Sequence, residues 1–262
     1  MASKETCYAI REVADITGIK PVTLRAWQRR YNLIQPERTD KGHRLYTQSD
    51  IEKIKCVQGW LAKGVSIGKV KSLIDSNTLL TEQTTSVQLD EVEHVLEALS
   101  LLDGSKTDRI ISYVLKEYPL AVVETQFVLP VLSAIDFVKA GLRSLQLALF
   151  RTTLINRLML MIQAESKKSL ASKCLLINMD SVGNVFAWFY YANLVEQGIA
   201  VTFLDGVDEI AALFNDEIMM NFQHVHVFAE KSLSEKHLAV IREQREYRDT
   251  QIHVSPVIDL LI

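Results

Sequence analysis

Basic side chains are concentrated on one face of a short helix predicted over residues 21–31. Pro21 suits its first turn, because an amide there has no intrahelical partner. Arg25 and Arg29 are four residues apart and project from one face, with Arg30 on its flank. The residues between them on that face are small: Val22 and Ala26. Arginines separated by small side chains are typical of a helix that enters the major groove of DNA, so we expect Arg25, Arg29 and Arg30 to contact DNA.

The opposite face of this predicted helix suits a hydrophobic core. Its members recur at the three- and four-residue spacing of one helical stripe: Leu24, Trp27, Gln28 and Tyr31. A short helix is predicted before it, over residues 10–16, and Gly18 can supply the left-handed turn between the two. This pattern predicts a helix-turn-helix whose second helix is the recognition helix.

A basic hairpin is predicted after the recognition helix, over residues 38–46. Its tip is the turn-forming sequence Asp-Lys-Gly at residues 40–42. His43 is better explained by DNA contact than by metal binding, because no second metal ligand stands at a suitable spacing from it. Two further helices, starting near Thr47 and Ser66, would brace this wing. The wing side chains that could reach phosphates or a minor groove are Arg38, Lys41, His43 and Arg44.

The charge of the chain is distributed unevenly. Residues 1–75 contain 14 Lys and Arg against 8 Asp and Glu, a net charge of +6. Residues 76–262 contain 15 against 24, a net charge of −9. The basic segment is therefore the part suited to binding a polyanion such as DNA.

Length and composition predict a multidomain protein of the cytoplasm. A chain of 262 residues is long enough for two or three domains. Its three cysteines are scattered, which argues against a disulfide framework or a zinc site. No uncharged apolar run of membrane-spanning length and no signal sequence is evident, so we expect a cytoplasmic, nucleoid-associated protein without a membrane segment.

The N-terminal motifs resemble a known family of regulators. The sequence reads A-I-R-E-V-A at residues 9–14, T-L-R-A-W-Q-R-R-Y at 23–31 and G-H-R-L-Y at 42–46. Together with Leu33, Pro36 and Arg38, these motifs resemble the winged-helix head of MerR family transcription regulators, here over residues 7–75. Family members usually read T-L-R-Y-Y-E, and A-W-Q-R-R-Y is similar to the MlrA-like and light-sensing branches. The resemblance implies DNA contacts from Thr23, Arg25, Arg29, Tyr31, Arg38, His43 and Arg44.

The middle of the chain predicts a linker followed by helices. Residues 76–90 are rich in Ser, Thr and Gln and are interpreted as a linker. Residues 91–166 carry helical apolar stripes, with a break at Pro119 and an expected kink at Pro130, and predict a central four-helix bundle.

The last part of the chain predicts an α/β domain. Over residues 167–262, apolar strand-like runs at 174–179, 199–204 and 224–228 alternate with helical segments, and a last strand is expected near 252–254. This alternation indicates a flavodoxin-like, Rossmann-type domain with a small, doubly wound parallel sheet.

A helical bundle followed by such a sheet resembles the cobalamin-binding module of methionine synthase and of light-sensing MerR regulators. That module binds cobalt through the histidine of D-x-H-x-x-G after its first strand. Residues 180–184 read Asp-Ser-Val-Gly-Asn and have no histidine, while Phe137 and residues 147–148 replace the capping residues of the light sensors. His224 and His226 are interpreted as ordinary residues of the third strand. We expect a degenerate module without cofactor or metal.

Three classes of function follow from these features. The favoured one is a transcriptional regulator that binds double-stranded promoter DNA as a homodimer, with a C-terminal module for protein interaction or dimerisation. The alternative is a regulator that senses cobalamin or another small molecule in the crevice near residues 180–184 and 205–206. The third, an enzyme or cobalamin carrier, is not expected, because no nucleophile elbow, phosphate-binding loop or other catalytic spacing occurs.

Overall fold

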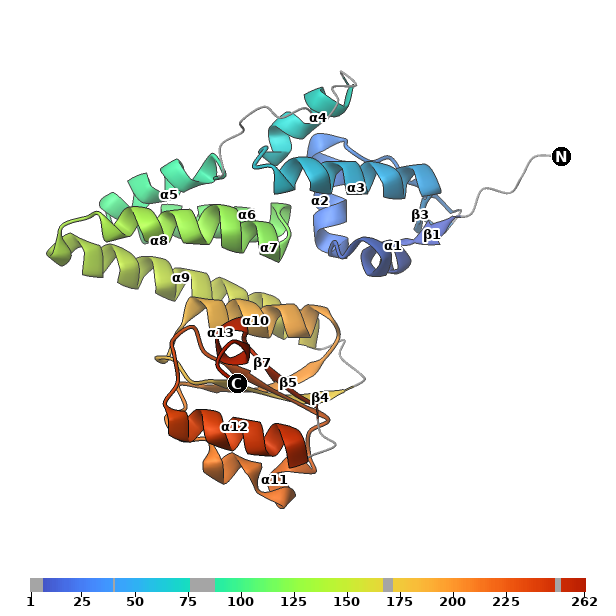
Figure 1. The fold of residues 1–262 in the computed structure, drawn as a ribbon. Helices are drawn as coiled ribbons and strands as arrows, with labels where there is room; N and C mark the ends of the chain where they lie inside the picture. The colour runs from blue at the N-terminus through green and yellow to red at the C-terminus, as the bar shows by residue number, and fades with distance from the viewer. Residues whose placement is uncertain (1–6, 40, 76–87, 167–171, 248–250) are drawn as a thin grey trace. The chain divides into compact units, whose positions relative to one another are not determined.

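A computed structural model describes residues 7–39, 41–75, 88–166, 172–247 and 251–262 of the chain. The chain divides into two compact units, Met1–Phe150 and Arg151–Ile262, which are drawn in Figure 1 and described separately below. The predicted domain boundaries at residues 75, 90 and 166 stay a prediction, and most of the predicted linker, residues 76–87, lies outside the described residues.

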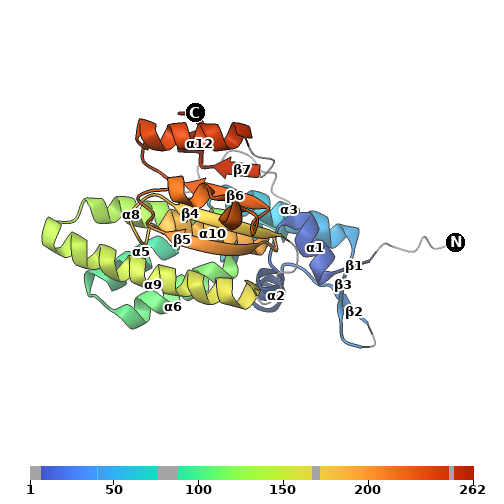
Figure 2. The ribbon, with the colours of Figure 1, turned by 90° about the horizontal axis from the view of Figure 1, so that it is seen from below.

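The first unit begins with the predicted helix-turn-helix and wing. Its elements are β1 (Tyr8–Ala9), α1 (Ile10–Thr17), α2 (Pro21–Tyr31), β2 (Glu37–Arg38), β3 (Arg44–Tyr46), α3 (Gln48–Ala62) and α4 (Ile67–Asp75). The strands form an antiparallel sheet in the order β1-β3-β2, and the β2–β3 hairpin, called the wing below, extends from it in Figure 2.

Local signals end and start these helices as the sequence predicts. Gly18 caps α1 with a φ of 69°, and its amide donates to the Ala14 carbonyl at 2.8 Å. Thr47 starts α3 through a reciprocal capping box with Asp50. The recognition helix ends at Tyr31, as the sequence predicts, and Asn32 after it adopts the left-handed conformation, with a φ of 52°.

Helices fill the rest of the first unit. They are α5 (Glu91–Ser100), α6 (Gly104–Glu117), α7 (Leu120–Val123), the π-helical segment η1 (Glu124–Val128), α8 (Leu129–Asp136) and the first part of α9 (Ala140–Ser166). The packing core includes Val95, Val114 and Phe127, and the Phe127 and Phe150 rings lie 6.2 Å apart. The assignment of these helices to one four-helix bundle stays a prediction.

Pro130 produces a π-helical turn where the sequence predicts a kink. A proline has no amide for the carbonyl four residues earlier, which here belongs to Gln126. The Gln126 carbonyl instead accepts a hydrogen bond from the Leu89 amide at 2.9 Å. The segment that leads into α5 is thus bonded through Leu89 to the π-helical turn η1.

Helix α9 is long and apolar enough, by length and composition alone, to cross a membrane. The core helix of a soluble protein satisfies the same criteria, so this is weak evidence for a membrane segment. Phe150, Leu154 and Leu158 are fully buried at the four-residue spacing of a packed helical face. The absence of a membrane segment stays a prediction.

The second unit is built on a four-stranded parallel sheet in the order β5-β4-β6-β7. Its strands are β4 (Lys173–Asn178), β5 (Ala200–Asp205), β6 (His224–Phe228) and β7 (Gln251–Val254). Its helices are α10 (Val185–Glu196), η2 (Ala211–Phe214), α11 (Asp216–Met219), α12 (Glu235–Tyr247) and α13 (Pro256–Asp259). The helical segment predicted between the strand runs at 199–204 and 224–228 is wrong as one element, because Asn215 interrupts it and caps α11.

Both faces of this sheet are covered, which explains the continuous apolar run of β4. Cys174 and Leu176 point to the cluster formed with α10, while Leu175 and Ile177 point to the cluster formed with α12 and η2. Figure 1 shows α10 on one side of the sheet and α11 and α12 on the other. The parallel sheet is confirmed, and its assignment to the flavodoxin-like class stays a prediction.

Candidate nucleic-acid interface

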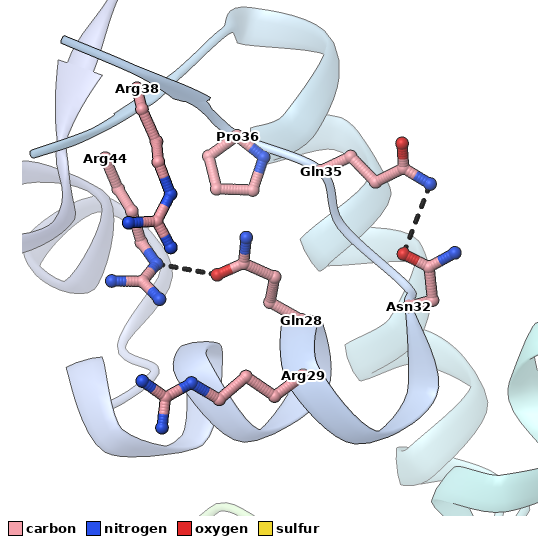
Figure 3. A pocket seen from close by; sticks show the side chains of 7 residues that line it. All are labelled: Gln28, Arg29, Asn32, Gln35, Pro36, Arg38 and Arg44. Carbon is pink, nitrogen blue, oxygen red and sulfur yellow. Dashed lines mark hydrogen bonds between the residues drawn. The ribbon is translucent and has the colours of Figure 1, made fainter. Parts of the chain in front are cut away.

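Four arginines from α2 and the wing lie close together, and three of them line one concave surface. Arg25 and Arg29 are exposed on α2, whereas Arg38 and Arg44 lie on the wing strands β2 and β3. We call these four residues the basic face. Figure 3 shows three of them, Arg29, Arg38 and Arg44, around a hollow of about 520 Å³ between α2 and the wing. The other residues lining this hollow are Gln28, Asn32, Gln35 and Pro36.

The wing geometry places its two arginines opposite each other. Arg38 pairs with Arg44 in the antiparallel β2–β3 register. The hairpin closes through a 2.9 Å hydrogen bond from the Thr39 amide to the His43 carbonyl, and Gly42 has the positive φ of 80° that the turn requires. Lys41 and His43 are exposed at this hairpin, so the predicted wing contacts lie on one accessible element.

The pKa of Arg44 responds to the other arginines of the basic face. Burial lowers the pKa of its guanidinium, and repulsion by Arg38, Arg25 and Arg29 lowers it further, against the opposing effect of Tyr46. An arginine stays protonated at neutral pH despite such a shift. The basic face therefore brings four positive charges close together, as a phosphate-binding surface requires.

Gln28 belongs to this surface, although the sequence stripe predicts it in the core. Its side chain is half-buried, and its Oε1 accepts a hydrogen bond from Arg44 Nε at 2.6 Å. This bond joins the recognition helix to the wing, as Figure 3 shows. The sequence offered one signal against a core position for Gln28: its side chain is a polar amide, whereas the stripe it shares with Leu24, Trp27 and Tyr31 is otherwise apolar or aromatic.

Replacing Gln28 with alanine is expected to weaken DNA binding about threefold to tenfold, because Arg44 loses the partner that orients it. Fluorescence anisotropy with a labelled duplex would measure the change. Gln35→Ala is the matched control, since Gln35 lines the same hollow but bonds Asn32. Equal affinities for Gln28→Ala and Gln35→Ala would contradict the positioning role of Gln28.

Three predicted DNA contacts lie away from the basic face. Thr23 is buried, and its hydroxyl donates to the Lys116 carbonyl at 3.1 Å. Arg30 forms an ion pair with Glu117, and the Tyr31 hydroxyl lies 2.6 Å from that of Tyr113. All three partners belong to α6, which lies more than 80 residues further along the chain. The sequence could not reveal this packing, and the structure does not group Thr23, Arg30 and Tyr31 with the other predicted contacts.

Histidines of the parallel sheet lie close together without forming a cluster of metal ligands among the described residues. In the described ranges, no group of three or more His, Cys, Asp or Glu side chains could hold a metal ion. His226 stacks on His253 at 4.5 Å, and its Nδ1 lies 2.7 Å from the Tyr190 hydroxyl. Burial lowers the pKa of His226 to about 4, with further repulsion from His253 and His224, so its ring is neutral at pH 7.

Comparison with known proteins places this interface in context. Residues 8–77 match the model of the MerR HTH family regulatory proteins. The chain is 35% identical over 164 residues to the HTH-type transcriptional regulator MlrA of Salmonella typhimurium, a match that covers 62% of this chain and 65% of that protein. It is also 34% identical over 70 residues to the HTH-type transcriptional repressor CarH of Myxococcus xanthus, covering 27% and 23% of the two chains. The chain thus matches less than two thirds of the length of each of these relatives.

Proposed function

This chain carries a MerR-type helix-turn-helix domain at its N-terminus and resembles MlrA over most of its length, and from this premise we propose that it is a transcriptional regulator that binds promoter DNA through the basic face. The observation that carries the proposal is that three arginines from α2 and the wing, Arg29, Arg38 and Arg44, line one hollow, and that Arg25 lies close enough to repel the Arg44 guanidinium. The recognition helix can supply base contacts while the wing supplies phosphate contacts. Such a regulator acts in the cytoplasm, at the nucleoid.

We further propose that it acts as a homodimer, because one winged helix reads too few base pairs for useful specificity. Selection of binding sites from a random duplex library by the full-length protein tests both statements. Enrichment of a two-fold symmetric motif would support a dimeric regulator, and enrichment of a single half-site would contradict the dimer. No enrichment would contradict sequence-specific binding.

For the C-terminal unit we propose a role in protein interaction or dimerisation. The support is the internal pairing of the polar groups at the carboxyl ends of the strands, where open α/β sheets bind ligands. Asp180 Oδ2 accepts the Glu230 amide at 2.7 Å and the Asn184 side-chain amide at 3.1 Å. Asp205 accepts the Asn178 side-chain amide at 2.6 Å and the Gly183 amide at 3.0 Å. These groups are already used by the chain itself.

The residues present do not fit cobalamin. The segment at residues 180–184 offers no histidine, and Gly206 lies so close to Val182 that an added Cβ would stand 2.3 Å from the Val182 side chain. The loops over this edge of the sheet are thus tightly packed against each other. The second candidate function is a small-molecule sensor. Such a sensor would bind its ligand at this same tightly packed edge of the sheet, so its ligand would have to be smaller than a corrinoid.

The full-length protein is expected not to retain cobalamin. Its absorbance would be followed through gel filtration after incubation with an excess of hydroxocobalamin, with a known cobalamin-binding protein as the positive control. The expected result is that the protein and the colour elute separately. Co-elution at a stoichiometric ratio would make the alternative function, a cobalamin-responsive regulator, the better one.

A further inference from the structure

The recognition helix packs on the end of α6 as well as on its own domain. The last carbonyls of a helix have no intrahelical partner and need other donors. Two of those at the end of α6 are bonded by side chains of α2. Thr23 Oγ1 donates to the Lys116 carbonyl at 3.1 Å, and Trp27 Nε1 donates to the Glu117 carbonyl at 2.9 Å. The buried face of the recognition helix therefore caps a helix outside the helix-turn-helix domain.

The side chain of Glu117 adds a charged contact to this cap. It is fully buried, whereas its ion-pair partner Arg30 keeps 51% of its side chain exposed. Burial raises the pKa of the Glu117 carboxyl, and the Arg30 guanidinium opposes that rise. A buried carboxylate without a cation is strongly destabilising, so Arg30 is required at this position by Glu117.

Arg30 is also held by a second side chain of α6. Its guanidinium carbon lies 6.0 Å from the centre of the Tyr113 ring. Tyr113 in turn bonds Tyr31, the last residue of α2. The adjacent Arg29 is exposed about 100° further round the helix and belongs to the basic face. One turn of the recognition helix thus carries two neighbouring arginines with different environments.

We propose that Glu117 is a positioning residue for DNA binding: it fixes the recognition helix on α6 through Arg30 and the Trp27 cap, and it withholds the charge of Arg30 from DNA. The inference rests on the proposed function, DNA binding through the basic face. Its consequence is that a residue outside the helix-turn-helix domain sets how many cations α2 presents to the phosphate backbone. Helix α6 thereby constrains the recognition helix through direct contacts.

The salt dependence of DNA binding tests this proposal. Each phosphate contact contributes about −0.9 to the slope of log affinity against log salt. Glu117→Gln in the full-length protein is expected to steepen the slope on a random duplex by about 0.9, because Arg30 becomes free to contact a phosphate. The double variant Glu117→Gln, Arg30→Ala is expected to return to the wild-type slope. Glu97→Gln is the control of equal charge, since Glu97 pairs with Lys106 at 2.7 Å on an exposed surface.

Two results in this assay would overturn the proposal. An unchanged slope for Glu117→Gln would mean that Glu117 does not withhold Arg30. A slope that is flatter by about 0.9 for Arg30→Ala alone would mean that Arg30 already contacts a phosphate in the wild-type complex. Arg29→Ala serves as the reference for a residue of the basic face and is expected to flatten the slope.

Hydrogen exchange of the α2 amides tests positioning without DNA. Glu117→Gln and Arg30→Ala are each expected to speed exchange in α2 severalfold. The double variant is expected to add little, because both substitutions remove the same ion pair. Exchange that stays at the wild-type rate in both variants would overturn the inference even if the protein binds DNA. If the wild-type protein binds no DNA while exchange responds as expected, the proposed function fails and the positioning of α2 by Glu117 stands.

Discussion

Arg29→Ala is expected to cost the protein about tenfold or more in affinity for a selected binding site and to change which bases it selects. Arg29 is exposed on the recognition helix beside the hollow in Figure 3 and stands clear of the contacts made by α6. A bidentate contact from arginine to guanine discriminates against a wrong base by about 1–3 kcal/mol. Loss of that contact would therefore reduce specific binding more than random binding.

Binding-site selection and titration with selected and random duplexes would measure this effect. Arg44→Ala provides the comparison, because a phosphate-contacting wing residue should weaken binding to all sequences alike and flatten the salt slope by about 0.9. Arg109→Ala, which removes an exposed arginine of α6, should leave both quantities unchanged. Equal losses on selected and random DNA for Arg29→Ala would show that Arg29 contacts the backbone and not bases.

Trp27→Ala is expected to lower the free energy of unfolding by about 3–5 kcal/mol. Trp27 is fully buried in α2, so its removal leaves a large cavity. Its Nε1 also bonds the Glu117 carbonyl at 2.9 Å, and this carbonyl would lose its donor. The destabilisation should therefore extend to α6, because the two helices share this side chain.

Urea unfolding followed by circular dichroism would measure the loss for the full-length protein. Trp27→Phe separates the two causes, since it keeps most of the apolar volume and removes the indole donor. Its cost is expected to be about 1–3 kcal/mol. Val22→Ala, at a position 44% exposed on the same helix, is the control. A shift of the midpoint for Trp27→Ala no larger than that for Val22→Ala would contradict the shared core.

The sequence by itself determined the local architecture of the helix-turn-helix domain. Pro21, Gly18 and Thr47 act on the few residues beside them, through a missing amide, a left-handed turn and a side-chain cap. Periodicity likewise separates the arginine face of α2 from its apolar face, because helical geometry is the same in every context. The parallel sheet followed from continuous apolar runs such as that of β4, because a strand that is covered on both faces is apolar along its whole length.

Only the tertiary structure decided which polar side chains belong to the interface. Gln28 and Arg44 are 16 residues apart, and Arg30 and Glu117 are 87 apart, so no local spacing relates either pair. Arg29 and Arg30 have the same chemistry and adjacent positions, yet α6 neutralises one and leaves the other on the basic face. Charge and periodicity predict which side chains of a helix could face DNA. The element packed against the helix determines which of those side chains stay exposed and which are paired inside the protein.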